Sequence, residues 1–253
     1  MDKLHISLAA ETVFHIGSFP VTNSLLVSLT VSIFLIIFAA IFSKTFKKIP
    51  QKTQNVIEII VETFSDLAES IGGPKTRDFL PLVISIFLYV LLCNWIGLLP
   101  GFGSIGIKEI KDGHEVLVPL FRGASADLNT TLALALVSFF AIQFFGFSHH
   151  KLGYLKRFIN FSSPVAFFTG ILEIISEFAK IISFSFRLFG NVFAGEVLLA
   201  VVISLVPVVV PLPFFGLEIF VGFIQALVFA MLTLVFINIA VSHGEEVEPD
   251  RGH

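Results

Sequence analysis

Long apolar stretches without charged residues constrain the fold of this chain more than any other feature. The sequence has 253 residues, of which 55% are hydrophobic and only 14% are charged, whereas soluble domains carry roughly 25% charged residues. Several stretches contain about 20 or more uncharged residues, the length of an α-helix that crosses the hydrocarbon core of a bilayer. The chain is therefore too apolar to be water-soluble, and we expect an all-α integral membrane protein.

Charge, cysteine content and motifs argue against several other classes of protein. A net charge of −3 gives no indication of nucleic-acid binding, and the single cysteine, Cys93, cannot form an intramolecular disulfide. The uncharged run from Thr12 to Ser43 is longer than the apolar region of a signal peptide and ends in lysines rather than a cleavage site. No G-x-x-x-x-G-K-[ST] loop for nucleotide occurs in the sequence. The adjacent His149 and His150 are interpreted as surface residues at a basic membrane boundary, so we expect no metal and no other cofactor.

Five membrane segments are predicted from the apolar pattern. Basic residues follow two of them, around Lys48 and around Lys156, and basic loops tend to remain in the cytoplasm. The N-terminus is therefore expected outside, and the C-terminus, with a flexible acidic tail at 244–253, in the cytoplasm. The expected segments, all in a single membrane domain of residues 1–253, are 23–42, 79–99, 127–147, 161–205 and 214–241.

Residues 54–72 are predicted to form an amphipathic helix on the cytoplasmic membrane surface. Apolar residues recur there at helical spacing, and acidic residues occupy the other face. Because the polar face is acidic, attraction to anionic lipid is not expected, and the acids face either water or a partner protein. These acids are Glu58, Glu62, Asp66 and Glu69.

The last two membrane segments carry charged residues in apolar surroundings. A charge at the bilayer centre costs roughly 2.5–3.5 kcal/mol on insertion scales, so such residues usually belong to ion pathways. At 100° per residue, Glu196 points away from Arg187, which lies nine positions earlier, while Glu218 and Gln225 share one helix face. Arg187 belongs to a polar stripe at helical spacing, extended backwards by Glu173 and Glu177, that contains Lys180, Ser183, Arg187 and Asn191.

These residue types favour different functions. An arginine stays protonated even in a poor dielectric, whereas a buried glutamate can take up and release a proton. Arg187 is therefore interpreted as a fixed charge, and the glutamates as a proton relay. A structural ion pair between Arg187 and Glu196 is disfavoured by their opposite facing. Hydrogen bonding between helices remains an alternative for Glu218 and Gln225.

Three short runs occur in order along the chain. They are Ser125–Thr130 (SADLNT), Ser185–Glu196 (SFRLFGNVFAGE) and Gly222–Phe229 (GFIQALVF). The first resembles the start of the third span, the second the signature, and the third the last-helix motif of subunit a of the F-type, rotary ATP synthase. The order of segments matches that family along nearly the whole chain. Three motifs in order are far more specific than one arginine in a membrane segment.

The resemblance implies a fold and partners. Subunit a is a stator component that is not an enzyme by itself, and it conducts protons through two offset half-channels to carboxylates on a rotor ring of subunit c. Its other expected partners are subunit b of the peripheral stalk and membrane lipid. The last two helices, 161–205 and 214–241, would form a strongly tilted hairpin beside the ring. Separately from the resemblance, an N-terminus without an Arg-rich, Ser-rich presequence favours the inner, cytoplasmic membrane of a bacterium, with an organelle-encoded protein as the alternative.

The resemblance also implies roles for individual residues. Arg187 matches the family's essential arginine, and Glu196 and Gln225 match polar positions of a half-channel. The family often has an acid and a histidine at the positions of Glu196 and Glu218, whereas this chain has two acids. The basic partner of the relay is therefore left open, and two close carboxyl groups are expected to share a proton. The remaining matches, polar positions on the arginine's helix, are Lys180, Ser183 and Asn191.

Two other functions use membrane charges. A proton-coupled secondary transporter could also carry arginine and glutamates, but it would be expected to show an internal repeat, which is not evident here. An intramembrane hydrolase is disfavoured because the sequence has no G-x-S-x-G run and no histidine within the deep apolar segments. The coupling ion, H⁺ or Na⁺, is set by the ring carboxylate and its ligands on another chain.

Overall fold

The computed structural model describes residues 10–44, 52–99, 106–111, 114–119, 122–158, 163–206 and 209–242. The basic turn around Lys48 and the tail expected at 244–253 lie outside these ranges. Within them the chain is mainly helical, and five helices are long and apolar enough to cross a membrane, which confirms the prediction of an all-α membrane protein. They are α1 (Asn23–Ser43), α3 (Leu80–Ile96), α4 (Leu128–His150), α5 (Pro164–Leu205) and α6 (Pro211–Ser242).

Three of these helices begin at a residue that the sequence supplies for capping. The side chains of Thr22, Asp127 and Ser163 each accept a hydrogen bond from a backbone N–H in the first turn of α1, α4 and α5. These bonds satisfy donors that have no partner within the helix. At the start of α4, Asp127 Oδ1 accepts this bond from the Asn129 backbone N–H at 3.1 Å.

Two antiparallel hairpins lie outside the helical bundle and were not predicted. Strand β1 (Thr12–Ile16) pairs with β2 (Phe19–Thr22), and β3 (Gly106–Lys111) pairs with β4 (His114–Pro119). The first turn uses Gly17 at φ 64°, a conformation that glycine adopts without steric cost. Strands of four to six residues are too short to give a periodic signal beside spans of more than 20 residues.

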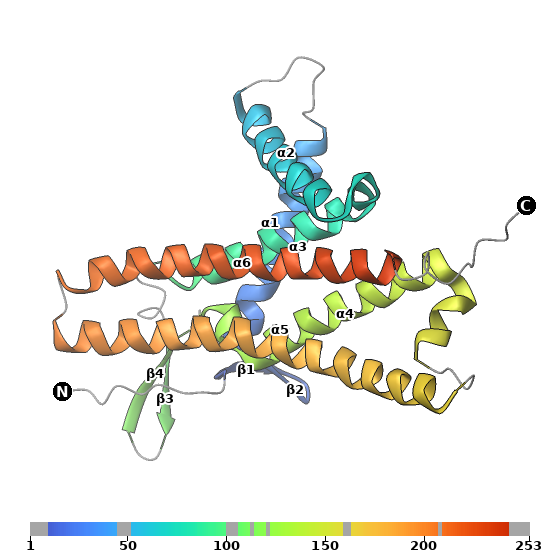
Figure 1. The fold of residues 1–253 in the computed structure, drawn as a ribbon. Helices are drawn as coiled ribbons and strands as arrows, with labels where there is room; N and C mark the ends of the chain where they lie inside the picture. Colours follow the sequence, from blue (N-terminus) through green and yellow to red (C-terminus); the bar gives the residue numbers. More distant parts are fainter. Residues whose placement is uncertain are drawn as a thin grey trace, which may run out of the picture.

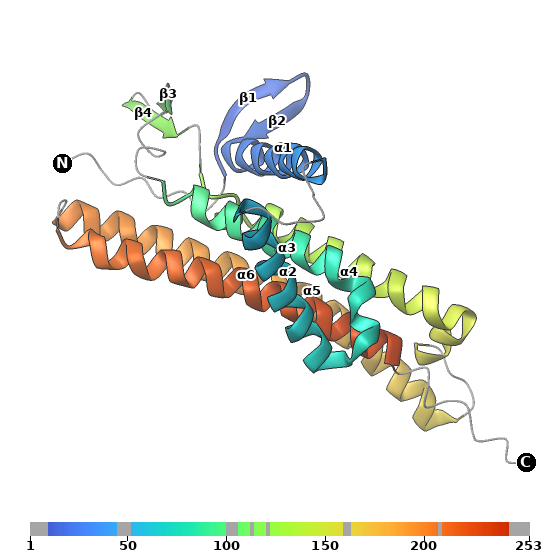
Figure 2. The same cartoon turned by 90° about the horizontal axis from the view of Figure 1, so that it is seen from above.

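The long helices α5 and α6 form a hairpin against which α3 and α4 pack. In Figure 1, α5 and α6 lie side by side along their lengths, while α1 runs across their direction. Figure 2 shows the same hairpin with α3 and α4 along one side of it. The buried face of α6 is rich in small residues, which let neighbouring backbones approach closely. In lipid there is no hydrophobic driving force for helix association, so such close packing stabilises the bundle. Its buried small residues are Gly222, Ala226, Ala230, Thr233 and Ala240.

The α5–α6 hairpin is too long to stand upright in a bilayer. At 1.5 Å per residue, the 42 residues of α5 and the 32 of α6 extend about 63 Å and 48 Å. The hydrocarbon core is only about 30 Å thick. Held within it, both helices must tilt by roughly 50° or more from the bilayer normal. These lengths agree with the strongly tilted hairpin expected from the sequence.

The amphipathic helix occupies α2 (Lys52–Gly72). Its buried residues Phe64 and Ala68 join the hydrophobic core of the bundle, and the Phe64 and Phe87 rings lie 4.7 Å apart. Arg77, in the short helix η1 (Pro74–Phe79) that follows, pairs with Glu69 of α2. One side of α2 is thus packed on the protein, while other apolar residues of the helix, such as Ile59, remain exposed.

Candidate functional site

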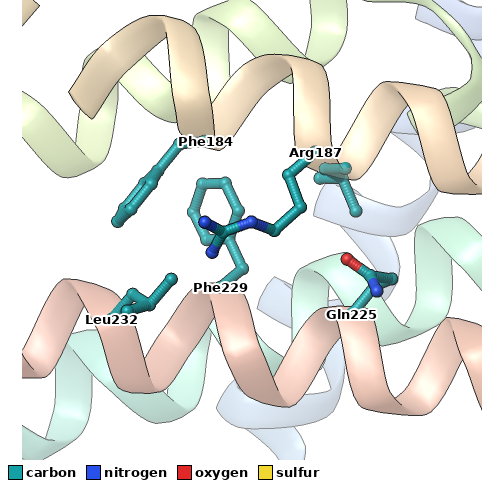
Figure 3. A pocket seen from close by; sticks show the side chains of 6 residues that line it. Phe184, Arg187, Gln225, Phe229 and Leu232 are labelled. Atoms are coloured by element: carbon teal, nitrogen blue, oxygen red, sulfur yellow. The ribbon is translucent and has the colours of Figure 1, made fainter. Parts of the chain in front are cut away.

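Arg187 lies in the middle of α5 on an exposed side of the helix. Its side chain projects toward α6 and lines a small pocket between the two helices (Figure 3). Its Nη2 lies 3.5 Å from Ser183 Oγ, one turn earlier. Among the residues that the structure describes, no carboxylate forms an ion pair with Arg187. The pocket is lined by Phe184, Arg187, Leu188, Gln225, Phe229 and Leu232.

The exposed side of α5 carries three residues of the predicted polar stripe. Ser183, Arg187 and Asn191 are each exposed and follow one another at intervals of four residues, so they face the same way. Large apolar side chains, including Ile182 and Phe186, are exposed beside them. The structure therefore places a permanent charge on a mostly apolar helix surface that this chain does not cover.

Glu196 has a basic partner that the spacing of residues in the sequence does not indicate. Arg122 Nε lies 3.2 Å from Glu196 Oε2, and the Arg122 side chain is only 9% exposed. Its guanidinium also lies over the Phe193 ring, 5.8 Å from the centroid. Arg122 lies in the segment leading to η3 (Ala124–Ala126), three residues before the Ser125–Thr130 motif. That proximity to a motif was the signal that could have identified it.

Glu218 of α6 lies beside Glu196 of α5. It is buried, and a Cβ atom added to Gly195 would collide with its carboxyl group. The charges of the two glutamates are close enough to interact. The structure therefore gathers Arg122, Glu196 and Glu218 into one group, which we call the carboxyl cluster. Gln225, which shares the α6 face with Glu218, lies about two turns farther along, beside Arg187 in the pocket (Figure 3).

Lys180 belongs to a third polar group. Its Nζ lies 2.7 Å from Glu177 Oε1 and 4.6 Å from the centroid of the Phe236 ring. Gln143 Nε2 donates to Glu177 Oε2 at 3.1 Å, and the Tyr154 hydroxyl donates to Gln143 Oε1 at 3.0 Å. This network ties α4 and η4 (Lys151–Arg157) to α5. The sequence placed Lys180 on the stripe but gave no sign of Gln143 or Tyr154, whose positions depend on how the helices pack.

The described ranges contain no group of three or more His, Cys, Asp or Glu residues that could hold a metal ion. The ring nitrogens of His149 and His150 contact backbone carbonyl groups instead: His149 Nδ1 lies 3.1 Å from the Phe145 oxygen, and His150 Nε2 contacts the Val241 oxygen. His150 thus joins the end of α4 to the end of α6.

The fold and the site define a multi-pass membrane protein whose two longest helices hold one open arginine and two neighbouring glutamates. A model of the protein family described as ATP synthase A chain matches residues 24–238. The chain therefore belongs to the ATP synthase A chain family. It is a membrane subunit of the proton-translocating ATP synthase and acts within that complex.

Proposed function

We propose that this chain carries protons to and from a rotor ring along two offset half-channels. The observation that carries the proposal is the separation of charges on the hairpin. Arg187, which lines the pocket, is exposed and has no carboxylate partner in the described part of the chain. The carboxyl cluster, in contrast, contains its own basic residue, Arg122. Two separated half-channels require a fixed cation and a proton relay at different points along the hairpin.

The outer half-channel consists of Glu218, Gln225 and Glu196. A proton taken up from outside passes along these residues and neutralises a carboxylate of the ring, which can then turn into lipid at low cost. After nearly a full rotation the carboxyl group reaches the second half-channel and releases the proton to the cytoplasm. Transfer across the membrane supplies about 2.3 kcal/mol per proton for each 100 mV, so several protons are needed per ATP. Nucleotide chemistry belongs to other subunits.

Arg187 separates the two half-channels. Its permanent charge stabilises a ring carboxylate that has lost its proton. The same charge repels a proton that would otherwise pass directly from one half-channel to the other. Ser183 and Asn191, on the same exposed face of α5, provide polar contacts for each ring carboxylate as it passes. Lys180, bound to Glu177, is the member of the stripe farthest toward the expected cytoplasmic end.

Arg122 supplies the basic partner that the two-acid relay needs. Two neighbouring carboxylates repel one another when both are ionised. A guanidinium at 3.2 Å from Glu196 balances one negative charge, so the cluster can hold a single exchangeable proton without excess charge. The relay then works with two acids and an arginine.

The partners and the orientation follow from the same scheme. The open face of α5 contacts the ring of subunit c, and other surfaces contact subunit b and lipid. The protein lies in the inner, cytoplasmic membrane with its N-terminus outside and its C-terminus in the cytoplasm, in keeping with the basic turns.

The decisive experiment is purification of the intact complex, followed by ATP-driven proton pumping in inverted vesicles with wild-type and Arg187→Ala subunits. We expect the ring to co-purify with both and pumping to be lost only in the variant. A chain that purifies without a ring and binds a small solute would instead support a transporter.

A further inference from the structure

Helix α3 binds the backbone of α6 through two adjacent side chains. Asn94 Nδ2 donates to the Gly222 carbonyl oxygen at 2.9 Å, and Trp95 Nε1 donates to the Ile219 carbonyl oxygen at 3.0 Å. The helices approach closely at this point. A Cβ atom on Gly222 would lie only 3.2 Å from Asn94 Cβ and 3.5 Å from Trp95 Cδ1. A hydrogen atom in place of a side chain at Gly222 therefore makes room for the contact.

These two bonds fix α6 in a specific way. A backbone carbonyl oxygen has two lone pairs, so it can accept a side-chain donor in addition to its bond within the helix. Two such bonds, three residues apart on one helix, oppose both rotation of α6 about its axis and sliding along it. Contacts between side chains alone would permit small movements of either kind.

The bound carbonyl groups lie one and four positions after Glu218. Glu218 is thus on the same stretch of α6, and its carboxyl group fits against the Cβ-free backbone of Gly195. The Glu218 carboxyl group lies at the end of a long side chain, so even a small rotation of α6 would displace it. Such a rotation would move the carboxyl group away from Glu196. The titratable and charged groups around it are Glu196 on α5 and, paired with Glu196, Arg122.

We propose that Asn94 and Trp95 are positioning residues that hold the Glu218 carboxyl group in register with Glu196 for proton transfer. The inference rests on the proposed function, because it gives these residues a part in the outer half-channel. Neither residue touches the reacting carboxyl groups in this scheme. They act through the backbone of α6.

Asn94 offers a way to separate positioning from stability. Its Oδ1 is buried and has no hydrogen-bond partner within the described ranges. Losing one partner of a buried hydrogen bond is costly when the other is left unsatisfied, but the Gly222 carbonyl group lies within α6 and can keep its helical bond, and the unsatisfied Asn94 Oδ1 acceptor is removed as well. Asn94→Leu removes the bond to α6 together with this acceptor, so the complex should assemble normally. Trp95→Phe removes the indole N–H and keeps an aromatic ring at the contact.

The test uses the whole ATP synthase in membrane vesicles. Proton uptake from the outer side and its pH profile are measured for Asn94→Leu, for Trp95→Phe and for the double variant, each normalised to assembled complex. Bonds of this kind between membrane helices are modest, and we expect uptake to fall about threefold for each variant and roughly eightfold for both, with a shifted pH profile. Asn94→Gln, which keeps an amide donor, should recover part of the loss.

Tyr89→Phe is the matched control. Tyr89 lies on the same helix, and its hydroxyl lies near Ser28 and Ser32 of α1, so the loss of this hydroxyl should not affect Glu218. Normal uptake and a normal pH profile in the double variant would overturn the positioning role. A fall in total uptake that normalisation to assembled complex removes, with an unchanged pH profile, would show a structural role and overturn it as well. Coupled pumping by an Arg187→Ala complex measured in parallel would instead overturn the proposed function itself.

Discussion

The guanidinium of Arg122 lies 3.2 Å from the carboxylate of Glu196, although the two residues are 74 positions apart in the sequence. The Arg122 side chain is buried, and Glu196 is more accessible, with 39% of its side chain exposed. The pair thus joins the segment before α4 to the C-terminal part of α5. It also places a permanent positive charge on the acid that lies beside Glu218.

Arg122→Ala should impair proton uptake more than assembly. The substitution leaves Glu196 without its basic partner and beside Glu218, so two acids must share a site with no balancing charge. Because Glu196 is partly exposed, water screens part of the loss, and we expect about a tenfold fall in proton pumping rather than the larger effect of a fully buried pair. Pumping in inverted vesicles, normalised to co-purified ring, measures it.

Two further variants make this experiment decisive. Adding Glu196→Gln to Arg122→Ala removes the unpaired charge and should restore assembly to the extent that it fell. Arg77→Ala breaks the exposed pair with Glu69 and should leave pumping unchanged, because exposed ion pairs contribute little. Equal pumping by wild type and Arg122→Ala would contradict a functional role for the pair.

Gly195→Ala should reduce proton transfer although alanine favours the helix. A methyl group at this position collides with the Glu218 carboxyl group and must displace it from Glu196. Gly216→Ala is the matched control, since a Cβ atom there meets nothing within 4 Å. Alanine is better than glycine in a helix by about 1 kcal/mol, so both variants should insert and assemble. Similar pumping rates for the two would show that the close contact has no function.

Glu218→Gln and Glu196→Gln should each slow proton flow without abolishing assembly. Glutamine preserves the size and hydrogen-bonding capacity of the side chain but cannot exchange a proton. Passive proton conduction through membranes stripped of the catalytic sector, driven by an imposed potential, would isolate the step. Unchanged rates in both variants would mean that these residues only form hydrogen bonds between helices.

Arg187→Ala should leave the protein inserted and the ring bound, because removing a charge from a membrane helix lowers its insertion cost. ATP-driven pumping and ATP synthesis should both be lost, since ring carboxylates would no longer be kept ionised as they pass. Passive leak of protons should rise, because the barrier between half-channels is gone. Near-normal coupled pumping by an assembled complex would refute the central claim.

Arg187→Lys is a sharper form of the same test. Lysine keeps a positive charge but lacks the planar guanidinium group and can lose its proton when it is desolvated. We therefore expect little or no coupled pumping by Arg187→Lys in the same vesicle assay. Full activity would mean that any positive charge at this position is sufficient.

Much of the fold was predictable because membrane helices carry their signal locally. An apolar run of 20 residues, a capping residue such as Asp127 and the length of the segment that contains Arg187 are all visible in one stretch of sequence. Helical periodicity also places Ser183, Arg187 and Asn191 on one face, and the structure has all three exposed. These predictions need only the geometry of a single helix.

Contacts between distant segments were not predictable in this way. Nothing in the spacing of charges indicates that Arg122 reaches Glu196, or that Gln143 links Tyr154 to Glu177. Such contacts depend on which helices are neighbours and on where small residues let them approach. The two short hairpins were missed for a different reason, since short strands carry too few residues for a clear pattern.

The great length of α5 changes what its sequence spacing means. Arg187 and Glu196 are nine residues apart, or about 13 Å along the helix axis. In an upright helix this interval would be a difference in depth. In a helix inclined by more than about 50°, most of it becomes a displacement parallel to the membrane plane. A carboxyl group carried past the hairpin at constant depth would therefore pass the positions of the two residues one after the other, so their order along the chain becomes an order in time.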